Sequence, residues 1–361
     1  MRYSLLIVVC CFILTHTYDN ASQQFEQVKQ WLINHNAFIS SKVSIINNNN
    51  NRYMIAKDNI EQDEHILFIP DQLNLNVINP IISKTCSLVQ YSHVSKATEC
   101  LVYFLTLDSL NDNSIFKLYY NYLPKSFNDF PIYYTDNNDI HLLEQSGLYK
   151  EYHKLQTQID SSYKEIQSFL PSTVTYEQYK FWYVMVMSRS FSRMVYTSDI
   201  ATLVPYLDLI NHANNQYDNA NYYYDGGRKG FCLQAMKRIS KNEEITILYS
   251  YDLNNILLLS KYGFILKDNS NQIGFYIHIN NNSYYLNGYF FQKAIMEVKD
   301  LIQRDFPSMS TYDILYEIRD TLKQRKDNLK YIKTSNTLLK NVLEEEYRTA
   351  YAFLDAVNEL I

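Results

Sequence analysis

Apolar residues recur along the chain with two different periods, and the change of period divides the sequence into regions. Residues 25–32 place their apolar side chains on one face of a 3.6-residue repeat, which predicts an amphipathic helix. Two short apolar runs then flank a polar turn, at residues 53–56 and 65–69, and such runs are typical of strands. From about residue 81 to 191 the repeat is helical again, so we expect a helical segment after these strands.

Strand-like runs return after residue 200. They lie at residues 203–210, 219–225, 230–236, 244–251 and 272–279. From Tyr289 onward apolar residues recur at helical spacing, and no internal repeat is visible. Strands and helices do not alternate regularly, and no Gly-x-Gly-x-x-Gly follows a strand, which disfavours a Rossmann fold. The pattern therefore predicts an α+β protein with a helical insert between short strands and a helical C-terminal region.

The N-terminal segment MRYSLLIVVCCFILTHTYDN has a basic residue, an apolar run at 5–14, and then small and polar residues. The run is short for a bilayer span and is typical of a signal peptide over residues 1–17, with a cut near Thr17. The alternative is a core strand or helix at the start of the chain. A signal peptide would direct the protein into the secretory pathway.

Three cysteines follow this segment, and no two of them form a Cys-x-x-Cys pair. They are Cys86, Cys100 and Cys232. So few cysteines at irregular spacing predict neither a disulfide framework nor a zinc site. The triplets that begin at Asn20 and Asn281 match the N-glycosylation pattern, which arises easily by chance in an Asn-rich chain.

Composition and charge narrow the class of protein. The 361 residues are enough for about two domains with a substantial core. The net charge is −5 and no basic block occurs, so nucleic acid is not the expected partner. Tyrosine is abundant, with 34 residues, whereas glycine is rare, with 7, so glycine-based motifs should look eroded here. The Asn run at 47–51 is expected to mark a loop.

The pair Asn211-His212 comes directly after the apolar run 203–210 and is the first candidate for chemistry. It could be a buried turn, a metal ligand or a cofactor clamp. Asp208 and His212 have the i, i+4 spacing of ligands on a helix, but the run reads as a strand and no second His lies at ligand spacing, so we expect no metal. The chain also lacks a Gly-x-Ser-x-Gly elbow and a phosphate-binding loop, which argues against a serine hydrolase or a nucleotide hydrolase.

Four stretches in a fixed order carry a more specific signal. They are RYMIAKDNIEQDEHILFIP (52–70), MSRSF (187–191), LVPYLDLINHA (203–213) and KRISKNEEITILYSYDLNNILLLSKYGF (237–264). This set resembles the SET-domain protein methyltransferases, and among them the group of the Rubisco large-subunit lysine methyltransferase and the actin histidine methyltransferase. The Asn-His-Ala and Tyr-Gly-Phe stretches, with their order and spacing, are the specific part of the resemblance, which covers nearly the whole chain after the N-terminal segment.

The resemblance implies an α+β fold of a known kind: a SET β-fold of short strands with a pseudoknot and a helical insert, followed by an all-α C-terminal substrate-binding domain. The expected parts are residues 22–85 and 191–280 for the two halves of the SET domain, 86–190 for the insert and 281–361 for the substrate-binding domain. The resemblance also implies a monomer without zinc that acts on a protein substrate. It implies the cytoplasm or nucleus, in contrast with the secretory N-terminus.

S-adenosylmethionine is the cofactor that the resemblance implies, and protein lysine is the implied target, with protein histidine as the alternative. Methyl transfer is an in-line displacement, so positioning and electrostatics supply much of the catalysis. By the resemblance, Asn211 and His212 bind the cofactor at its adenine, Arg189 lies near its carboxylate, and Phe264 packs against the adenine. Asp208 is expected to hold the local turn.

Two tyrosines in ILYSYDL compete for the catalytic role. In the family the catalytic tyrosine lies thirteen residues before the tyrosine of Tyr-Gly-Phe, and counting back from Tyr262 gives Tyr249. Tyr249 also shares a strand face with Ile245 and Ile247. Tyr251 would take the role if the alignment contained a two-residue gap. Tyr262 is expected to line the same channel as the catalytic tyrosine.

The sequence departs from the family where the first strand of the resemblance begins. The place of the family's Gly-x-Gly, whose backbone comes close to the cofactor, is taken by Arg52, Tyr53 and Met54, so the resemblance implies that these three residues bind the cofactor. Asn242 stands at another family glycine, and Asn tolerates left-handed turns better than most residues. These changes leave an alternative of a different class open: an inactive SET protein that binds a partner through its C-terminal helices.

Overall fold

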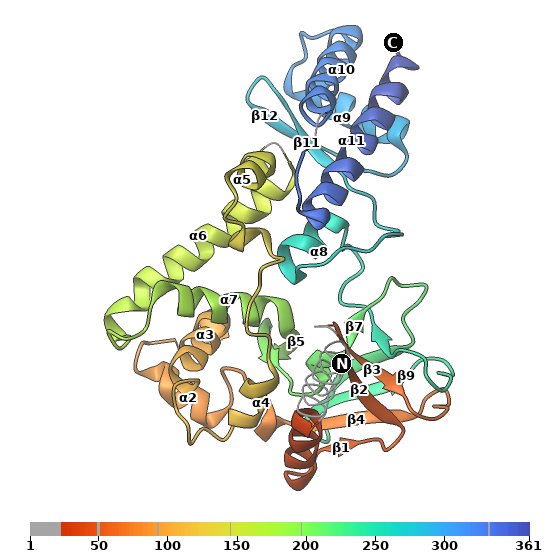
Figure 1. Ribbon diagram of the computed structural model, residues 1–361. Coiled ribbons are helices and arrows are strands. Elements are labelled where there is room, and N and C mark those ends of the chain that lie inside the picture. Colours follow the sequence, from red (N-terminus) through yellow and green to blue (C-terminus); the bar gives the residue numbers. More distant parts are fainter. Residues whose placement is uncertain (1–22, 49–50, 92–93, 145, 196, 331–332) are drawn as a thin grey trace, which may run out of the picture. The chain divides into compact units, whose positions relative to one another are not determined.

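The computed structural model describes residues 23–48, 51–91, 94–144, 146–195, 197–330 and 333–361 (Figure 1). The predicted signal peptide and Asn20 lie outside these residues. The chain divides into two compact units. The first contains the described residues up to Ser126 together with Ile159–Tyr251, and the second contains Phe127–Gln158 and Asp252–Ile361. No described helix is long and apolar enough to cross a bilayer.

A four-stranded antiparallel sheet lies in the first unit, with the strand order β1-β4-β9-β8. Its strands are β1 (Phe38–Ile39), β4 (His65–Pro70), β8 (Ala220–Asp225) and β9 (Gly230–Ala235). β4 lies between two neighbours, and its residues 66–69 are all buried. A strand covered on both faces has a continuous apolar run instead of alternation, which is the pattern seen here. The predicted strand at 65–69 is therefore confirmed.

Other strands of the first unit pair in twos. They are β2 (Val43–Asn48) with β3 (Asn51–Ala56), β5 (Ser190–Val195) with β6 (Ser198–Leu203), and β7 (Asn211–His212) with β10 (Thr246–Ile247). The β2–β3 hairpin corrects the prediction of a loop at 47–51, because Asn47 pairs with Arg52 across it. Strand pairing uses backbone groups, which Asn has like any other residue, and the buried Val43 and Met54 anchor the hairpin.

The apolar run LVPYLDLI is not one strand, contrary to the prediction. β6 ends at Leu203, Leu207–Leu209 form the short 3-10 helix η5, and the backbone is extended again at Ile210. Pro205 has no N–H to offer a strand partner, and Tyr206 has a φ of 72°, so the run is interrupted. The whole run is buried, and burial explains its apolar sequence better than strand structure does.

The first unit also contains five α-helices among the described residues, and one of them ends at Arg189. They are the helix at residues 23–34, α2 (Pro80–Ser87), α3 (Ala97–Asp108), α4 (Lys117–Tyr122) and α7 (Tyr176–Arg189), with the 3-10 helices η1 (Asp71–Leu73), η2 (Val94–Lys96) and η4 (Gln167–Phe169). α6 (Leu148–Ile166) begins in the second unit and ends in the first. The helix at 23–34 confirms the amphipathic prediction. α3 packs against α2 and α7 (Figure 1), and Arg189 is the last residue of α7.

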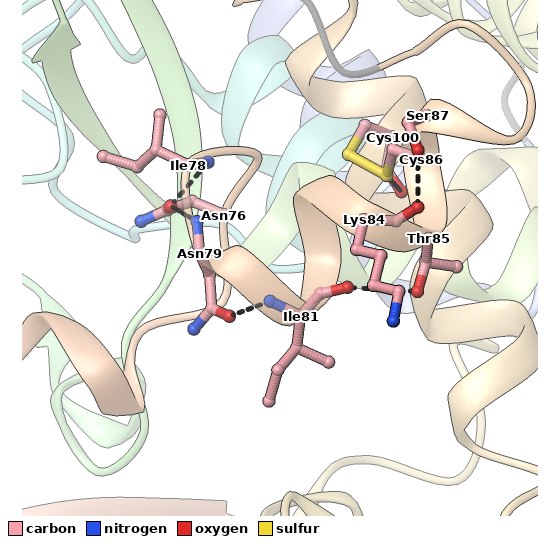
Figure 2. Close-up of a disulfide and its surroundings, with 9 residues drawn as sticks. All are labelled: Asn76, Ile78, Asn79, Ile81, Lys84, Thr85, Cys86, Ser87 and Cys100. Atoms are coloured by element: carbon pink, nitrogen blue, oxygen red, sulfur yellow. Dashed lines mark hydrogen bonds between the residues drawn. A yellow bond between two sulfur atoms is a disulfide. The ribbon is translucent and has the colours of Figure 1, made fainter.

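A disulfide between Cys86 and Cys100 joins α2 to α3 (Figure 2). The side chain of Asn79 caps α2 by accepting a hydrogen bond from the N–H of Ile81 at 3.1 Å, and Cys86 lies near the end of this helix. The Cα atoms of the two cysteines are 5.4 Å apart, although 14 positions separate them in sequence. The sequence predicted no disulfide framework, and it did not reveal this single bond, because the pairing depends on two helices that pack together and cysteine spacing does not show that packing.

The second unit is mostly helical. Its elements are η3 (Pro131–Tyr133), α5 (Asn137–Glu144), α8 (Asn255–Tyr262), β11 (Phe275–Ile279), β12 (Asn282–Leu286), α9 (Phe291–Asp305), α10 (Thr311–Asn328) and α11 (Thr337–Asn358). The C-terminal helices agree with the prediction. The β11–β12 hairpin contributes Ile277 and Leu286 to the same buried cluster as Ile318 and Phe353 of the helices, so β12 adds a strand to a segment predicted as all-α.

Candidate active site

Asn211 and His212 form β7, a two-residue strand that pairs in parallel with β10. Asn211 lies opposite Thr246 and His212 lies opposite Ile247. Asn219 supports the pair: its side-chain oxygen accepts from the N–H of Thr246 at 2.9 Å, and its amide donates to the carbonyl of Glu244 at 2.8 Å. Asn211 and His212 therefore belong to a strand pair. The partner strand β10 is fixed in turn by the side chain of Asn219.

Tyr249 lies directly beside this motif. Its backbone N–H donates to Nδ1 of His212 at 3.1 Å, and its hydroxyl donates to the carbonyl of Ile210 at 2.7 Å. The rings of Tyr249 and His212 have centroids 5.1 Å apart. Tyr251, the competing tyrosine, has 69% of its surface exposed. Of the two tyrosines, Tyr249 is thus the one that the structure brings together with Asn211-His212.

His212 is buried, and its surroundings disfavour the charged form of its imidazole. Burial lowers the pKa of its imidazole below the ordinary value, and a hydrogen bond with the backbone at Ile247 partly offsets this effect. Because Nδ1 accepts the N–H of Tyr249, the ring proton is assigned to Nε2 on the basis of this hydrogen bond. A neutral ring with a fixed tautomer is a rigid element of the site.

The side chain of Asn211 is oriented by Glu244. The Asn211 amide donates to Oε1 of Glu244 at 2.8 Å, and Glu244 itself forms a bridge with Ile55 of β3. The amide nitrogen is thus directed toward Glu244, and the Asn211 side chain remains partly exposed. This contact links the Asn-His motif to the strand on which Arg52, Tyr53 and Met54 lie.

Asp208 is a buried carboxylate with two phenol donors. The hydroxyl of Tyr122 donates to its Oδ1 at 2.8 Å, and the hydroxyl of Tyr119 donates to its Oδ2 at 3.1 Å. The Tyr122 oxygen also accepts the N–H of Tyr206 at 2.9 Å, and Tyr206 is the residue with a φ of 72°. Positive φ is unfavourable for a bulky residue, so these contacts stabilise a strained turn just before Asn211. Asp208 therefore holds the local turn, as its position in the sequence indicated.

Two arginines from different elements meet this group of residues, which we call the Asp208 cluster (Asp208, Tyr119, Tyr122). Nη1 of Arg189 donates to the carbonyl of Asp208 at 2.9 Å and lies 3.7 Å from its Oδ2. Nη1 of Arg52 donates to the carbonyl of Tyr122. Burial lowers the pKa of the Arg52 guanidinium to about 10, with repulsion from Arg189 as the next cause. The two guanidiniums thus lie close enough to repel each other.

The residues that replace the Gly-x-Gly differ in their surroundings. Met54 is fully buried, and its carbonyl accepts the N–H of Ile245 at 2.8 Å, so its side chain belongs to the core. Tyr53 pairs with Ile46 in the hairpin and is partly exposed. Arg52, two positions before Met54, is the one of these three whose side chain contacts the Asp208 cluster.

Tyr262 and Phe264 belong to the second unit. The predicted channel that Tyr262 lines with Tyr249, and the predicted packing of Phe264 against the adenine, therefore stay predictions. Their rings have centroids 6.2 Å apart. Gly263 between them ends α8 with a φ of 74°, and a Cβ atom added there would clash with the ring of Phe130. The turn and the neighbouring ring both require glycine at this position, which explains the middle residue of the Tyr-Gly-Phe stretch in structural terms.

Four residues around the site were not found from the sequence: Tyr119, Tyr122, Asn219 and Glu244. They act through contacts between segments that are far apart in the chain. A weak signal existed for two of them, because Tyr119 and Tyr122 have the i, i+3 spacing that places side chains on one face of a helix. Within the described ranges, no three His, Cys, Asp or Glu residues come together as a group that could hold a metal ion.

Comparisons with known proteins fit this geometry. Residues 73–250 match the SET domain family, and no curated protein matches the chain. The structure is similar to that of the SET domain of LSMT bound to lysine and AdoHcy, with a TM-score of 0.71 and 16% identity over 94% of this chain and 91% of that one. It is also similar to Rubisco LSMT bound to AdoMet, with a TM-score of 0.71 and 17% identity over 94% of this chain and 92% of that one. These matches confirm the predicted fold class: residues 73–250 match the SET domain family, and the fold of the chain is that of the Rubisco LSMT structures.

Proposed function

We propose that the protein is an S-adenosylmethionine-dependent protein N-methyltransferase that acts on lysine. The observation that carries this proposal is the joint placement of Tyr249, Asn211 and His212 in one hydrogen-bonded group within a SET domain. The lysine target is supported by similar structures of LSMT, which are described as bound to lysine or methyllysine. The described residues carry no metal-binding group, and the proposed chemistry requires none.

The residues present suit S-adenosylmethionine, which the SET family implies as cofactor. The cofactor combines an adenine, a sulfonium and an amino acid with a carboxylate. Neutral polar groups at Asn211 and His212 suit the adenine, and the guanidinium of Arg189 suits the carboxylate. The missing Gly-x-Gly is the departure from the family pattern that lies closest to the expected cofactor site, and its place is occupied by residues of β3.

When bound, S-adenosylmethionine supplies a methyl group that is activated by a sulfonium. The target lysine must first lose its proton, so that the neutral amine can form the new C–N bond while the C–S bond breaks. The hydroxyl of Tyr249 donates its proton to the carbonyl of Ile210. The lone pairs of its oxygen therefore remain available to accept from the target amine and the methyl group. The proposed role of Tyr249 is to orient the lysine amine and the methyl group. The proton that lysine releases passes to solvent.

The experiment begins with calorimetry of the purified chain with S-adenosylmethionine. We expect binding at micromolar concentration, and no binding at millimolar concentration would overturn the proposal. A lysate is then incubated with the protein and cofactor that carries a radiolabelled methyl group. The labelled proteins are hydrolysed and their methylated amino acids are identified. Methyllysine is the expected product, methylhistidine would reassign the target, and cofactor binding without any labelled product would favour the inactive binding protein.

We also propose that the protein enters the secretory pathway. The apolar N-terminal segment supports this location, and so does the buried disulfide between Cys86 and Cys100, because such bonds persist in oxidising compartments. Asn281 lies exposed at the turn of the β11–β12 hairpin, where a glycan could be attached. A C-terminal tag should appear in the secretory fraction, with Cys86 and Cys100 protected from alkylation until reduction. A cytosolic tag with both thiols free would contradict the proposal.

A further inference from the structure

Arg52 and Arg189 are partly buried and lie near one buried carboxylate, that of Asp208, so positive charge is in excess here. The ammonium of Lys125, which repels Arg52, adds to this excess, and protonation of Asp208 would increase it further. The phenols do not offset it, because burial and the nearby Asp208 raise the pKa values of Tyr119 and Tyr122 well above the ordinary range. Buried charge without an opposite partner is costly, so a surplus of this kind favours binding of an anion.

The hydrogen bonds of the two arginines support this conclusion. The bond of Arg52 ends on the carbonyl of Tyr122, and the bond of Arg189 ends on the carbonyl of Asp208, so neither guanidinium is hydrogen-bonded to a carboxylate by these contacts. Nε of Arg189 is buried and has no hydrogen-bond partner among the described residues. A guanidinium has five N–H donors in a planar fork that fits a carboxylate.

Arg193 shows how the same chain pairs a structural arginine with a carboxylate, although its Nε, like that of Arg189, is buried without a hydrogen-bond partner among the described residues. Its Nη1 and Nη2 donate to the two oxygens of Asp71 at 2.9 and 3.1 Å, and Nη2 also contacts the hydroxyl of Tyr224. This two-bond pairing with a carboxylate is the arrangement that Arg52 and Arg189 lack. The contrast indicates that a carboxylate from outside the chain completes the site.

We infer that Arg52 and Arg189 form a two-arginine site for one carboxylate, the α-carboxylate of the cofactor's methionine part, and that the side chain of Arg52 compensates for the lost Gly-x-Gly. The inference rests on the proposed function. Arg52 lies on β3, in the segment that replaces the two glycines, and its guanidinium contacts the residue that also binds Asp208. A carboxylate would offset part of the positive surplus, and the backbone contacts of the family would thereby be replaced by a charged side chain.

The test compares two ligands that differ only in this carboxylate: S-adenosylmethionine and decarboxylated S-adenosylmethionine. Calorimetry at one fixed ionic strength gives the affinity ratio of the two ligands for each protein. The wild type should prefer the carboxylated ligand, and Arg52→Gln should lose about tenfold to a hundredfold of that preference, the range expected for hydrogen bonds to a charged group. Arg52→Lys should lose less, because it keeps the charge but not the fork.

Arg238→Gln is the matched control, since it removes one guanidinium from an exposed ion pair with Glu61 and should keep the wild-type ratio. If Arg52 has only a structural role, Arg52→Gln should lower the affinity for both ligands equally and leave the affinity ratio unchanged. That result would overturn the inference but not the proposed function. A wild type that binds both ligands without preference would overturn it as well. A wild type that binds neither ligand would overturn the proposed function itself. If Arg52→Gln fails to fold, the ratio measured for Arg52→Lys decides.

Discussion

The backbone N–H of Tyr249 donates to Nδ1 of His212 at 3.1 Å, although 37 positions separate the two residues. The hydroxyl of the same tyrosine donates to the carbonyl of Ile210. Tyr249 therefore contacts the residues on both sides of Asn211, and its backbone and side chain make separable contributions. The backbone contact fixes the Asn-His motif, whereas the side chain brings a phenol to the same place.

Replacing Tyr249 with Phe separates these two contributions. The variant keeps the N–H bond to His212 and loses only the hydroxyl, so the fold of the motif should be retained. We expect the rate of methyl transfer to fall about 100-fold to 1000-fold, the range for removing one positioned polar group from an active site. Cofactor affinity, measured by calorimetry, should change by less than about threefold if the hydroxyl acts mainly in the transition state.

Tyr251→Phe is the control for this variant, because its side chain is largely exposed. It should leave both the rate and the cofactor affinity near the wild-type values. A larger loss of rate from Tyr251→Phe than from Tyr249→Phe would show that the tyrosine assignment is shifted by two residues.

Stability should depend on pH through His212. Burial lowers the pKa of this imidazole in the folded state, so the unfolded chain binds more protons once the pH falls below the ordinary value of about 6.5. The stabilisation that the neutral ring provides is complete above that pH and is lost as the pH falls through the lowered folded-state pKa. In His212→Asn, whose side-chain oxygen can replace Nδ1 as acceptor, thermal unfolding should depend less steeply on pH between about pH 8 and pH 5.

The control for His212→Asn is His278→Gln, which removes an exposed histidine and should keep the wild-type pH dependence. Burial raises the pKa of the Asp208 carboxyl, which acts in the opposite direction, but Asp208 is present in all three proteins and its effect cancels in the comparison. Identical pH profiles for the wild type and His212→Asn would mean that His212 is not held neutral by the fold.

Substitution of Gly263 should destabilise the protein, because both its left-handed backbone and the neighbouring ring of Phe130 exclude a side chain. Gly263→Ala would place a Cβ atom against the ring of Phe130 in a left-handed turn, so we expect it to lower the free energy of unfolding by about 2 to 4 kcal/mol. Gly226→Ala is the matched control, because a Cβ atom there meets nothing within 4 Å. Chemical denaturation measures both variants, and equal stability of the two would contradict the steric argument.

The disulfide should stabilise the helical part of the first unit. Cys86 and Cys100 close a short loop, and the entropy of such a loop in the unfolded chain corresponds to about 3 kcal/mol. The double variant Cys86→Ala with Cys100→Ala should lose about this amount in chemical denaturation, and a reducing agent should lower the wild type to a similar stability. The reducing agent should not affect the double variant. A wild type that is indifferent to reduction would show that the bond does not form.

Sequence reasoning succeeded where the information was local or lay in an ordered motif. The amphipathic helix at 23–34 and the strand β4 followed from apolar periodicity. It failed where distant segments decide the structure. The run 203–210 is apolar because it is buried, and its break at Tyr206 depends on a hydroxyl from Tyr122, 84 positions away. The disulfide likewise depends on the packing of α2 against α3.

Tyr122 and Tyr119 allow the support of the strained turn to be measured. Tyr122→Phe removes the donor to Oδ1 of Asp208 and also the oxygen that accepts the N–H of Tyr206, whereas Tyr119→Phe removes only the donor to Oδ2. Both phenols are buried, so the loss of a second hydrogen bond and an unsatisfied N–H should separate the variants by about 1 to 3 kcal/mol in the free energy of unfolding. Chemical denaturation of the two proteins gives this difference directly. Since each variant loses one hydroxyl and one bond to Asp208, equal destabilisation would mean that the bond to Tyr206 contributes nothing and that Asp208 alone holds the turn before Asn211.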